Sequence, residues 1–290
     1  MRYTKVKHSI LRCFFLHRNT ASILVFTMWV LAFFSILSVS VYRLVVSHLN
    51  FARALEERTV SHYLAGAACK YFQHERKKDD LSYDSLYLLR KKTARELGRI
   101  KFNYYLVDEE SKININTASS DILARVHGLN KELADAITNS SLRPFHMKEE
   151  LLLVDGVTQE VFTACKDYIT VYGKGQVNIN TSSKEVLVAL GMDDALYEAI
   201  QGYRAGTDGQ EATKDDNVFV GVSEIAGKIR AFRGLSPSEE AMLDEIMRQG
   251  LLGVKGENFC VMIETIVSGR SAMRYRIVVD INSIKQWEES

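Results

Sequence analysis

The stretch KININTASSDIL at residues 112–123 returns with the same spacing as QVNINTSSKEVL at residues 176–187. In both copies an extended Asn-Ile-Asn run leads into a threonine, and an acidic residue follows four positions later. A threonine hydroxyl can accept a hydrogen bond from a free N–H at a helix start, and the helix dipole favours an acid in the first turn. We therefore predict that each copy starts a helix with a capping threonine, and that the asparagine amides tie the extended run to nearby backbone. The residues of this structural motif are Asn114, Asn116 and Thr117 in the first copy, and Asn178, Asn180 and Thr181 in the second.

Each copy continues into a helix, a turn and a second helix, and two further segments carry the same turn without the asparagines. In all four, a helix ends at a glycine, which supplies left-handed backbone, and an apolar residue follows. The next residue is polar and can cap the second helix. Such hairpins must stack to bury their apolar faces, so we expect one helical domain. The four segments are 122–137, 149–165, 186–200 and 228–246, with capping residues Asn130, Thr158, Asp193 and Ser236.

Helix-hairpin-helix units often bind DNA, through a Gly-apolar-Gly turn whose N–H groups approach a phosphate. The second glycine is missing from all four turns, and acidic residues stand beside each of them. The formal net charge is +1, and the basic residues near a turn gather only at Lys228, Arg230 and Arg233. Phosphate binding needs clustered Lys and Arg. We therefore predict that the hairpins are scaffold and that no nucleic acid is bound, with a DNA-binding competence-type protein as the alternative.

The N-terminal region contains a membrane-spanning segment. No charged residue occurs from Asn19 to Tyr42, and Arg2, Lys5, Lys7, Arg12 and Arg18 precede this run. The run is long enough to cross a bilayer as a helix and is longer than the apolar region of a cleaved secretory signal. The positive-inside rule keeps the N-terminus cytoplasmic, so we expect a single-pass membrane protein whose bulk lies outside the cytoplasm. Apolar residues continue at helical spacing to Phe72, which predicts one long helix whose second half packs on a soluble domain.

The remaining segments predict a small sheet. We expect residues 81–100 to form a helix and residues 99–113 to form a strand, since the latter are rich in aromatic and β-branched residues. The stretches 258–269 and 273–281 alternate and predict a β-hairpin. None of the four cysteines forms a C-x-x-C pair, so we interpret them as small buried residues rather than as zinc or redox sites. No motif of an enzyme family is present, and we predict no enzymatic activity.

The order of these segments resembles the protein K family of minor pseudopilins, which belongs to type II secretion systems. The resemblance covers nearly the whole chain, and the paired Asn-Ile-Asn-Thr segments are its most specific part. It implies an α+β fold, in which a pilin-like long transmembrane helix and a small antiparallel sheet carry a large inserted α-helical domain of hairpin units. The stretches that carry it are MWVLAFFSIL (28–37), DEESKININTAS (108–119), RPFHMKEELLLVDGVTQEVF (143–162) and DYITVYGKGQVNINTSSKEVLVALG (167–191).

The resemblance also implies domain boundaries and processing. A basic prepilin-type leader would occupy residues 1–21, a transmembrane helix 22–46, a pilin-like αβ domain 47–113 with 257–290, and the inserted helical domain 114–256. Prepilin peptidase would cut between Ala21 and Ser22, with Ala21 standing where the family has glycine. Most pilins carry a glutamate at the fifth mature position, where this chain has Phe26. Lack of that glutamate is typical of the K subunit.

The implied function is that of a minor pseudopilin at the tip of the type II secretion pseudopilus, assisting protein export across the outer membrane. The implied partners are the I and J pseudopilins, the major pseudopilin and the inner membrane. A minor pilin of a type IV pilus shares the architecture and stays open as a second alternative.

The loop GTDGQEATKDDN at residues 206–217 gathers acidic side chains, and calcium prefers several oxygen ligands. Its spacing does not match the EF-hand pattern. The resemblance implies a calcium-binding periplasmic domain, although it does not place the ligands. The candidate ligands are Asp208, Glu211, Asp215 and Asp216, and the alternative is a solvated acidic loop.

Overall fold

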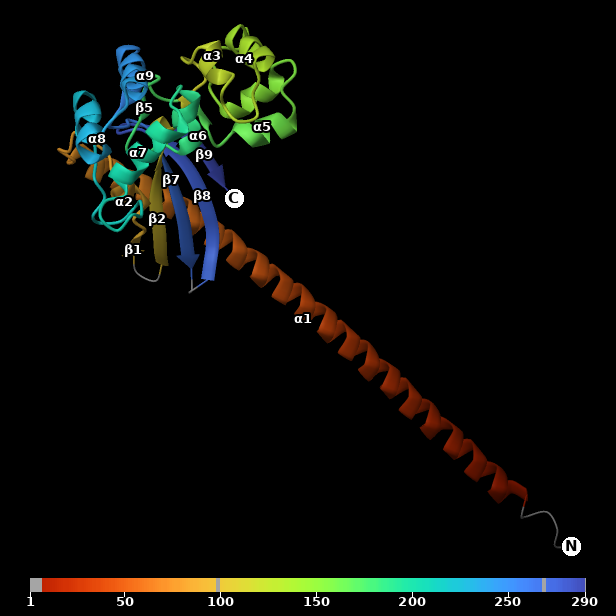
Figure 1. Ribbon diagram of the computed structural model, residues 1–290. Coiled ribbons are helices and arrows are strands. Elements are labelled where there is room, and N and C mark those ends of the chain that lie inside the picture. Colours follow the sequence, from red (N-terminus) through yellow and green to blue (C-terminus); the bar gives the residue numbers. More distant parts are fainter. Residues whose placement is uncertain (1–6, 98–99, 268–269, 290) are drawn as a thin grey trace, which may run out of the picture. The chain divides into compact units, whose positions relative to one another are not determined.

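The structure is a computed structural model that describes residues 7–97, 100–267 and 270–289 (Figure 1). The chain forms two compact units, which meet in sequence between Thr59 and Val60. A single helix, α1 (Lys7–Lys77), belongs to both units. In the first unit, nearly all side chains from Ser22 to Thr59 are exposed, including large apolar ones. Within the described residues, this is one helix whose length and composition allow it to cross a membrane.

The second unit contains a five-stranded antiparallel sheet of order β1-β2-β7-β8-β9. One face of the sheet, with Tyr104, Ile263 and Tyr275 in register across the middle strands, packs on the part of α1 that carries Ala68 and Phe72. The C-terminal part of α1 thus shares a buried core with the sheet, and the predicted β-hairpin is confirmed as β7 and β8. The strands are β1 (Thr93–Leu97), β2 (Ile100–Asp108), β7 (Phe259–Val267), β8 (Arg270–Val279) and β9 (Ile284–Glu289).

The predicted helix over residues 81–100 is wrong. Of the residues described in this range, α2 (Leu86–Arg90) alone is helical, and the chain then extends into β1, which pairs with β2. Pairing with a neighbouring strand has overridden the helix propensity of this segment. The predicted strand over 99–113 is correct only to Asp108, whose side chain caps a 3₁₀ turn, η1 (Glu109–Ser111).

A second core, separate from that of the sheet, runs from Ile113 to Leu252 and is enclosed by short helices. We call residues 113–254 the helical half, and residues 60–112 with 255–289 the sheet half. The helical half is inserted between β2 and β7, and Figure 1 shows α3, α4 and α5 grouped together. Its helices are α3 (Ser120–Leu123), α4 (Lys131–Thr138), η2 (Lys148–Leu153), α5 (Gln159–Cys165), α6 (Lys184–Ala189), α7 (Asp194–Arg204), η3 (Val222–Glu224), α8 (Ile225–Arg233) and α9 (Pro237–Arg248).

The four predicted hairpin turns are confirmed. Each turn glycine has positive φ, and the polar residue two positions later accepts a hydrogen bond from the backbone N–H three residues on. One expected helix differs, because η2 is a 3₁₀ helix. The glycines are Gly128, Gly156, Gly191 and Gly234, with φ of 85°, 85°, 108° and 82°.

Cys69, Cys165 and Cys260 are buried free thiols. Burial raises the pKa of Cys69 to about 12 and that of Cys165 to about 11. Such thiols stay protonated and inert near neutral pH, which agrees with their interpretation as small buried residues.

Candidate functional site

The two Asn-Ile-Asn-Thr segments open two modules of the helical half that close in the same way. In the first, β3 (Ile113–Asn114) pairs in parallel with β4 (Ile169–Thr170). In the second, β5 (Val177–Asn178) pairs in parallel with β6 (Leu252–Gly253). Each repeated segment therefore lies beside the end of its own module. We call residues 113–173 the first module and residues 177–256 the second module.

The second asparagine of each motif clamps a buried phenylalanine. Asn116 accepts a hydrogen bond from the N–H of Phe145 (2.7 Å) and donates one to the Phe145 carbonyl (2.8 Å). Asn180 makes the same pair of hydrogen bonds to Phe219, at 2.8 and 2.9 Å. Both amides also donate to a carbonyl just after the closing strand of the module, that of Val171 after β4 (3.3 Å) and that of Val254 after β6 (3.4 Å). The amides thus tie the extended run to nearby backbone.

The sequence gives little signal for this clamp, because the two phenylalanines stand at different distances from their asparagines and lie in unlike loops. Phe145 and Phe219 are 2% and 0% exposed, so their backbone groups are buried. A buried backbone N–H or C=O needs a partner, and in both modules one side-chain amide supplies both.

The predicted capping role of Thr117 and Thr181 is wrong. The helix caps are Ser119 and Ser183, two residues later. The backbone first makes a tight turn, in which the N–H of each threonine and of the next residue bonds the carbonyl of Asn114 or Asn178. Because the threonine belongs to this turn, the helix begins two residues later than predicted. Thr181 instead donates a hydrogen bond to Asp108 (2.8 Å).

An arginine supports each turn: Arg143 is half-buried and Arg204 is buried. Arg143 donates to the carbonyl of Ala118 (2.9 Å), and Arg204 donates to the matching carbonyl of Ser182 (2.9 Å) and to that of Ile179 (3.0 Å). Sequence reasoning missed both arginines, since they stand in unrelated segments. Burial lowers the pKa of each guanidinium, although neither loses its charge near neutral pH.

The first asparagines differ between the modules. Both accept a hydrogen bond from the N–H of the second asparagine, at 2.8 and 3.1 Å. The side-chain amide of Asn114 donates to the carbonyls of Tyr172 and Gly173 in its own module, both at 2.9 Å. The amide of Asn178 donates to two carboxylates of the sheet half, Asp108 (2.7 Å) and Asp84 (3.2 Å). The second module is therefore tied to the sheet half at this point.

Two further acidic residues at this junction are buried and paired. Glu109 bonds Lys112 at 2.7 Å, and although burial opposes ionisation, Lys112 holds the pKa of the Glu109 carboxyl below its usual range. Glu110 accepts hydrogen bonds from the N–H of Glu257 (2.8 Å) and from the side chain of Asn258 (2.8 Å). These contacts join the chain leaving β2 to the chain entering β7, which are the two points where the helical half is inserted.

The acidic loop uses its carboxylates internally. Asp215 accepts from the hydroxyl and the N–H of Thr207 and from the hydroxyl of Thr213, and these hydrogen bonds lower its pKa. Asp216 accepts from the N–H groups of Ala212 and Thr213, Asp208 accepts from the N–H of Gln210, and Glu211 pairs with the buried Arg204 at 2.5 Å.

Within the described ranges, no group of three or more His, Cys, Asp or Glu side chains is placed to hold a metal ion. Calcium binding by this chain stays a prediction, which calorimetry with calcium alone can test.

The predicted cleavage position falls on α1. Ala21 and Ser22 are helical, and the Ser22 side chain is exposed, while residues 1–6 of the predicted leader lie outside the described residues. Leader cleavage stays a prediction.

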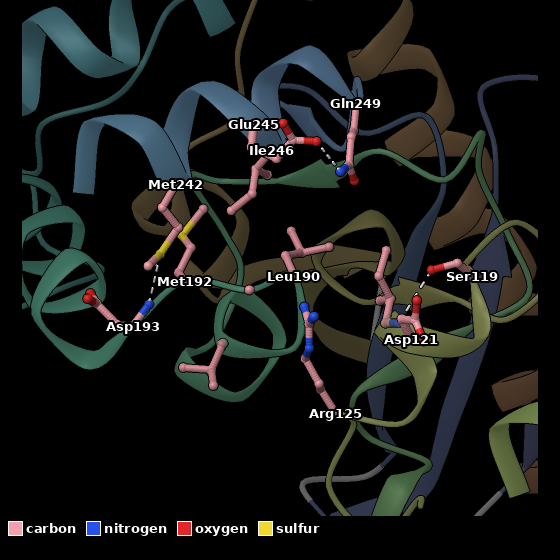
Figure 2. Close-up of a pocket in the computed structure, with 13 residues that line it drawn as sticks. Ser119, Asp121, Arg125, Leu190, Met192, Asp193, Met242, Glu245, Ile246 and Gln249 are labelled. Atoms are coloured by element: carbon pink, nitrogen blue, oxygen red, sulfur yellow. Dashed lines mark hydrogen bonds between the residues drawn. The ribbon is translucent and has the colours of Figure 1, made fainter. Parts of the chain in front are cut away.

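A cavity of about 550 Å³ lies between the two modules (Figure 2). Met242, Ile246 and Gln249 line it from α9, and Leu190 and Met192 line it from the turn between α6 and α7. The lining, all within the described chain, contains no histidine or cysteine that could act as base or nucleophile. The hydroxyl of Ser119, which also lines it, accepts from the N–H of Ile122 as the cap of α3.

Comparison with known proteins agrees with this architecture. A family model described as the helix-hairpin-helix motif matches residues 108–170, which closely coincide with the first module. A chain in the crystal structure of the GspK-GspI-GspJ complex from the enterotoxigenic Escherichia coli Type 2 Secretion System is similar to this chain, with a TM-score of 0.54 and 14% sequence identity. The likeness covers 84% of this chain and 96% of that chain.

The chain has a pseudopilin-like fold. The predicted fold class is thereby confirmed: a long apolar N-terminal helix, an antiparallel sheet and a helical domain form a pseudopilin-like chain. No curated protein matches the sequence.

Proposed function

We propose that this pseudopilin-like chain is the K subunit of a type II secretion system, a minor pseudopilin at the tip of the pseudopilus. The observation that carries the proposal is the insertion of a two-module helical half between β2 and β7 of a pilin-like sheet. The structural likeness to a chain of a GspK-GspI-GspJ complex covers 96% of that chain. The two modules and their paired asparagine turns agree with the resemblance noted from sequence.

The proposed role follows from the two ends of the molecule. The apolar part of α1 holds the protein in the inner membrane and then packs against the helices of other pseudopilins. Because Phe26 cannot pair with the N-terminal amine of a neighbouring subunit, the chain suits a terminal position with nothing above it. The bulk of the helical half blocks further addition at that end. Its partners are then the I and J pseudopilins, with the major pseudopilin below them.

Co-expression with the I and J pseudopilins of the same genome tests this assignment. The full chain, solubilised in detergent, should co-purify with both in a complex of one copy each, measured by native mass spectrometry. Omitting I or J gives the matched control for non-specific capture. Leu49→Glu, on the exposed apolar stripe of α1, should weaken capture at least tenfold, whereas Glu56→Gln on the same helix should not. Failure to recover any ternary complex would overturn the proposal.

DNA binding is the second candidate, and the helix-hairpin-helix match over residues 108–170 favours it. The basic residues near the fourth turn weigh against it, because Arg230 pairs with Glu240 (2.8 Å) and Arg233 with Glu239 (2.6 Å). A guanidinium held by a carboxylate is a poor phosphate ligand. We expect no shift of a DNA duplex at low salt. A shift that disappears when Lys228, Arg230 and Arg233 are changed to alanine would restore this candidate.

A further inference from the structure

The strand register of the two modules shows which residues are equivalent, and so which hydrogen bonds differ between the modules. Thr170 stands opposite Asn114 as Gly253 stands opposite Asn178, so Gly173 corresponds to Gly256. In the first module, the carbonyl of Gly173 accepts from Asn114. In the second, the carbonyl of Gly256 accepts from Arg76 of α1 (3.1 Å), and Asn178 is left to bond Asp84 and Asp108. Residues of the sheet half thus take part in the hydrogen bonds that close the second module.

The two carboxylates at this point share one donor in a buried space. The side chains of Asp84 and Asp108 belong to residues that are each 2% exposed, and both accept from the amide nitrogen of Asn178. Asp84 has a charged partner, Arg76, at 2.6 Å, and also accepts from the N–H of Gly256 at 2.5 Å. Among the described residues, the donors to the Asp108 side chain are neutral: the N–H of Glu110, the amide of Asn178 and the hydroxyl of Thr181.

Among the described residues, the nearby cations serve Asp84 and its neighbour Asp79 rather than Asp108. Arg76 bonds both Asp79 and Asp84 at 2.6 Å, and Lys255 lies 3.9 Å from Asp79. Lys112 is engaged with Glu109. A second buried negative charge beside Asp84, without its own cation, is costly. The other charged groups that face the pair or line the small cavity beside Asp108 are Arg90, Glu110, Asp167 and Lys255.

We propose that Asp84, Asp108 and Asn178 form a protonatable latch that holds the second module of the helical half against the sheet half, closed when one proton is held by the carboxylate pair. When the proton leaves, two carboxylates repel each other across one amide, and the contact between the halves loosens. Gly256 leaves the space the latch needs, because a Cβ at that position would lie 2.4 Å from a carboxylate oxygen of Asp108. This inference does not depend on the proposed function.

The direction of the pH effect follows from the same geometry. Burial, and after it the charge of Asp84, raises the pKa of Asp108 to about 7. In an open or unfolded state this carboxyl titrates near its ordinary value of about 4. The closed state therefore binds the extra proton between about pH 4 and pH 7, and its stability is lost as the pH rises through this window.

Hydrogen–deuterium exchange of the full chain in detergent, corrected for the intrinsic pH dependence of exchange, measures the latch. Protection of the peptides covering residues 108–112, 176–182 and 254–258 should fall about 100-fold from pH 5 to pH 8, as a pKa near 7 in the closed state and near 4 in the open state requires. Asp108→Asn should remove this pH dependence. Wild-type protection that is independent of pH, or an Asp108→Asn protein that keeps the wild-type profile, would overturn the proposal.

A second pair of variants keeps the test decisive if Asp108→Asn fails to fold. Thr181→Val removes a donor that favours the ionised Asp108, so the midpoint of the protection loss should move to higher pH. Thr117→Val is the matched control, because Thr117 occupies the same position in the first module and contacts no carboxylate there, only the carbonyl of Asn114 (3.4 Å). Equal midpoints for Thr181→Val and Thr117→Val would also contradict the latch.

Discussion

Asn180 satisfies both backbone groups of Phe219 with one side chain, and both residues are buried. Asn180→Ala should therefore leave a buried N–H and a buried carbonyl without partners, at about 1–3 kcal/mol each. We expect a loss of about 2–4 kcal/mol in the free energy of unfolding, since the two penalties partly relax. Chemical denaturation of the full chain in detergent, followed by tryptophan fluorescence and circular dichroism, measures it.

The same substitution in the first module should cost less. Asn116 makes the equivalent hydrogen bonds to Phe145, but its side chain is half-buried and water can reach part of the site. We expect about 1–2 kcal/mol for Asn116→Ala. Asn139→Ala is the control, because Asn139 is exposed at the C-terminal end of α4. Equal stability of the Asn116, Asn180 and Asn139 variants would show that the clamps contribute nothing to the fold.

At the scale of single elements, the hairpin turns were predictable because their signal is local. A glycine with left-handed backbone and a polar cap two residues later fix a turn without help from the rest of the chain, and all four are present. The segment 81–100 was not predictable, because its β1 part is decided by pairing with β2. The shift of the helix cap from Thr117 to Ser119 also depends on a contact, the tight turn closed by the Asn114 carbonyl.

The turn glycines allow a graded test of the hairpins. Gly128 and Gly234 both have positive φ, so alanine at either should cost at least about 1 kcal/mol. The cost should be higher at Gly234, because its ψ of 162° lies in a region nearly confined to glycine. A Cβ at Gly128 would also lie 2.6 Å from the Cβ of Ala164, whereas a Cβ at Gly234 meets nothing within 4 Å. Gly128→Ala should therefore lose a further 1–3 kcal/mol, roughly the penalty of overpacking, in the free energy of unfolding.

Gly227→Ala serves as the control for the turn glycines, because Gly227 lies within α8 with open space around its Cα and has no positive φ. Alanine there should be neutral or slightly stabilising. If the loss for Gly128→Ala does not exceed the ~1 kcal/mol expected for its positive φ alone, the close approach between α5 and the first turn is not tight.

At the scale of the whole molecule, the insertion explains why the sequence predicts the helical half but not its junction with the sheet half. The repeated Asn-Ile-Asn-Thr segments can be recognised in the sequence, and in the structure they open two equivalent modules. The junction residues Arg76, Asp84 and Asp108 come from three separated segments of the sheet half, and nothing in their spacing relates them to Asn178. Only the register of the modules shows that they replace a contact present in the first copy.

Leader removal is the prediction that concerns the chain as a whole, because it sets the N-terminus of the mature protein that would enter a pseudopilus. Co-expression with a prepilin peptidase should yield a mature protein that begins at Ser22, read from the intact mass. Ala21 stands where the family has glycine, and alanine is larger than glycine, so Ala21→Gly should raise the processed fraction and Ala21→Leu should abolish processing. An unchanged mass that begins at Met1 in both the wild type and Ala21→Gly would mean that the basic segment is not a leader. The positive charges before the apolar run would then act only to keep the N-terminus on the cytoplasmic side.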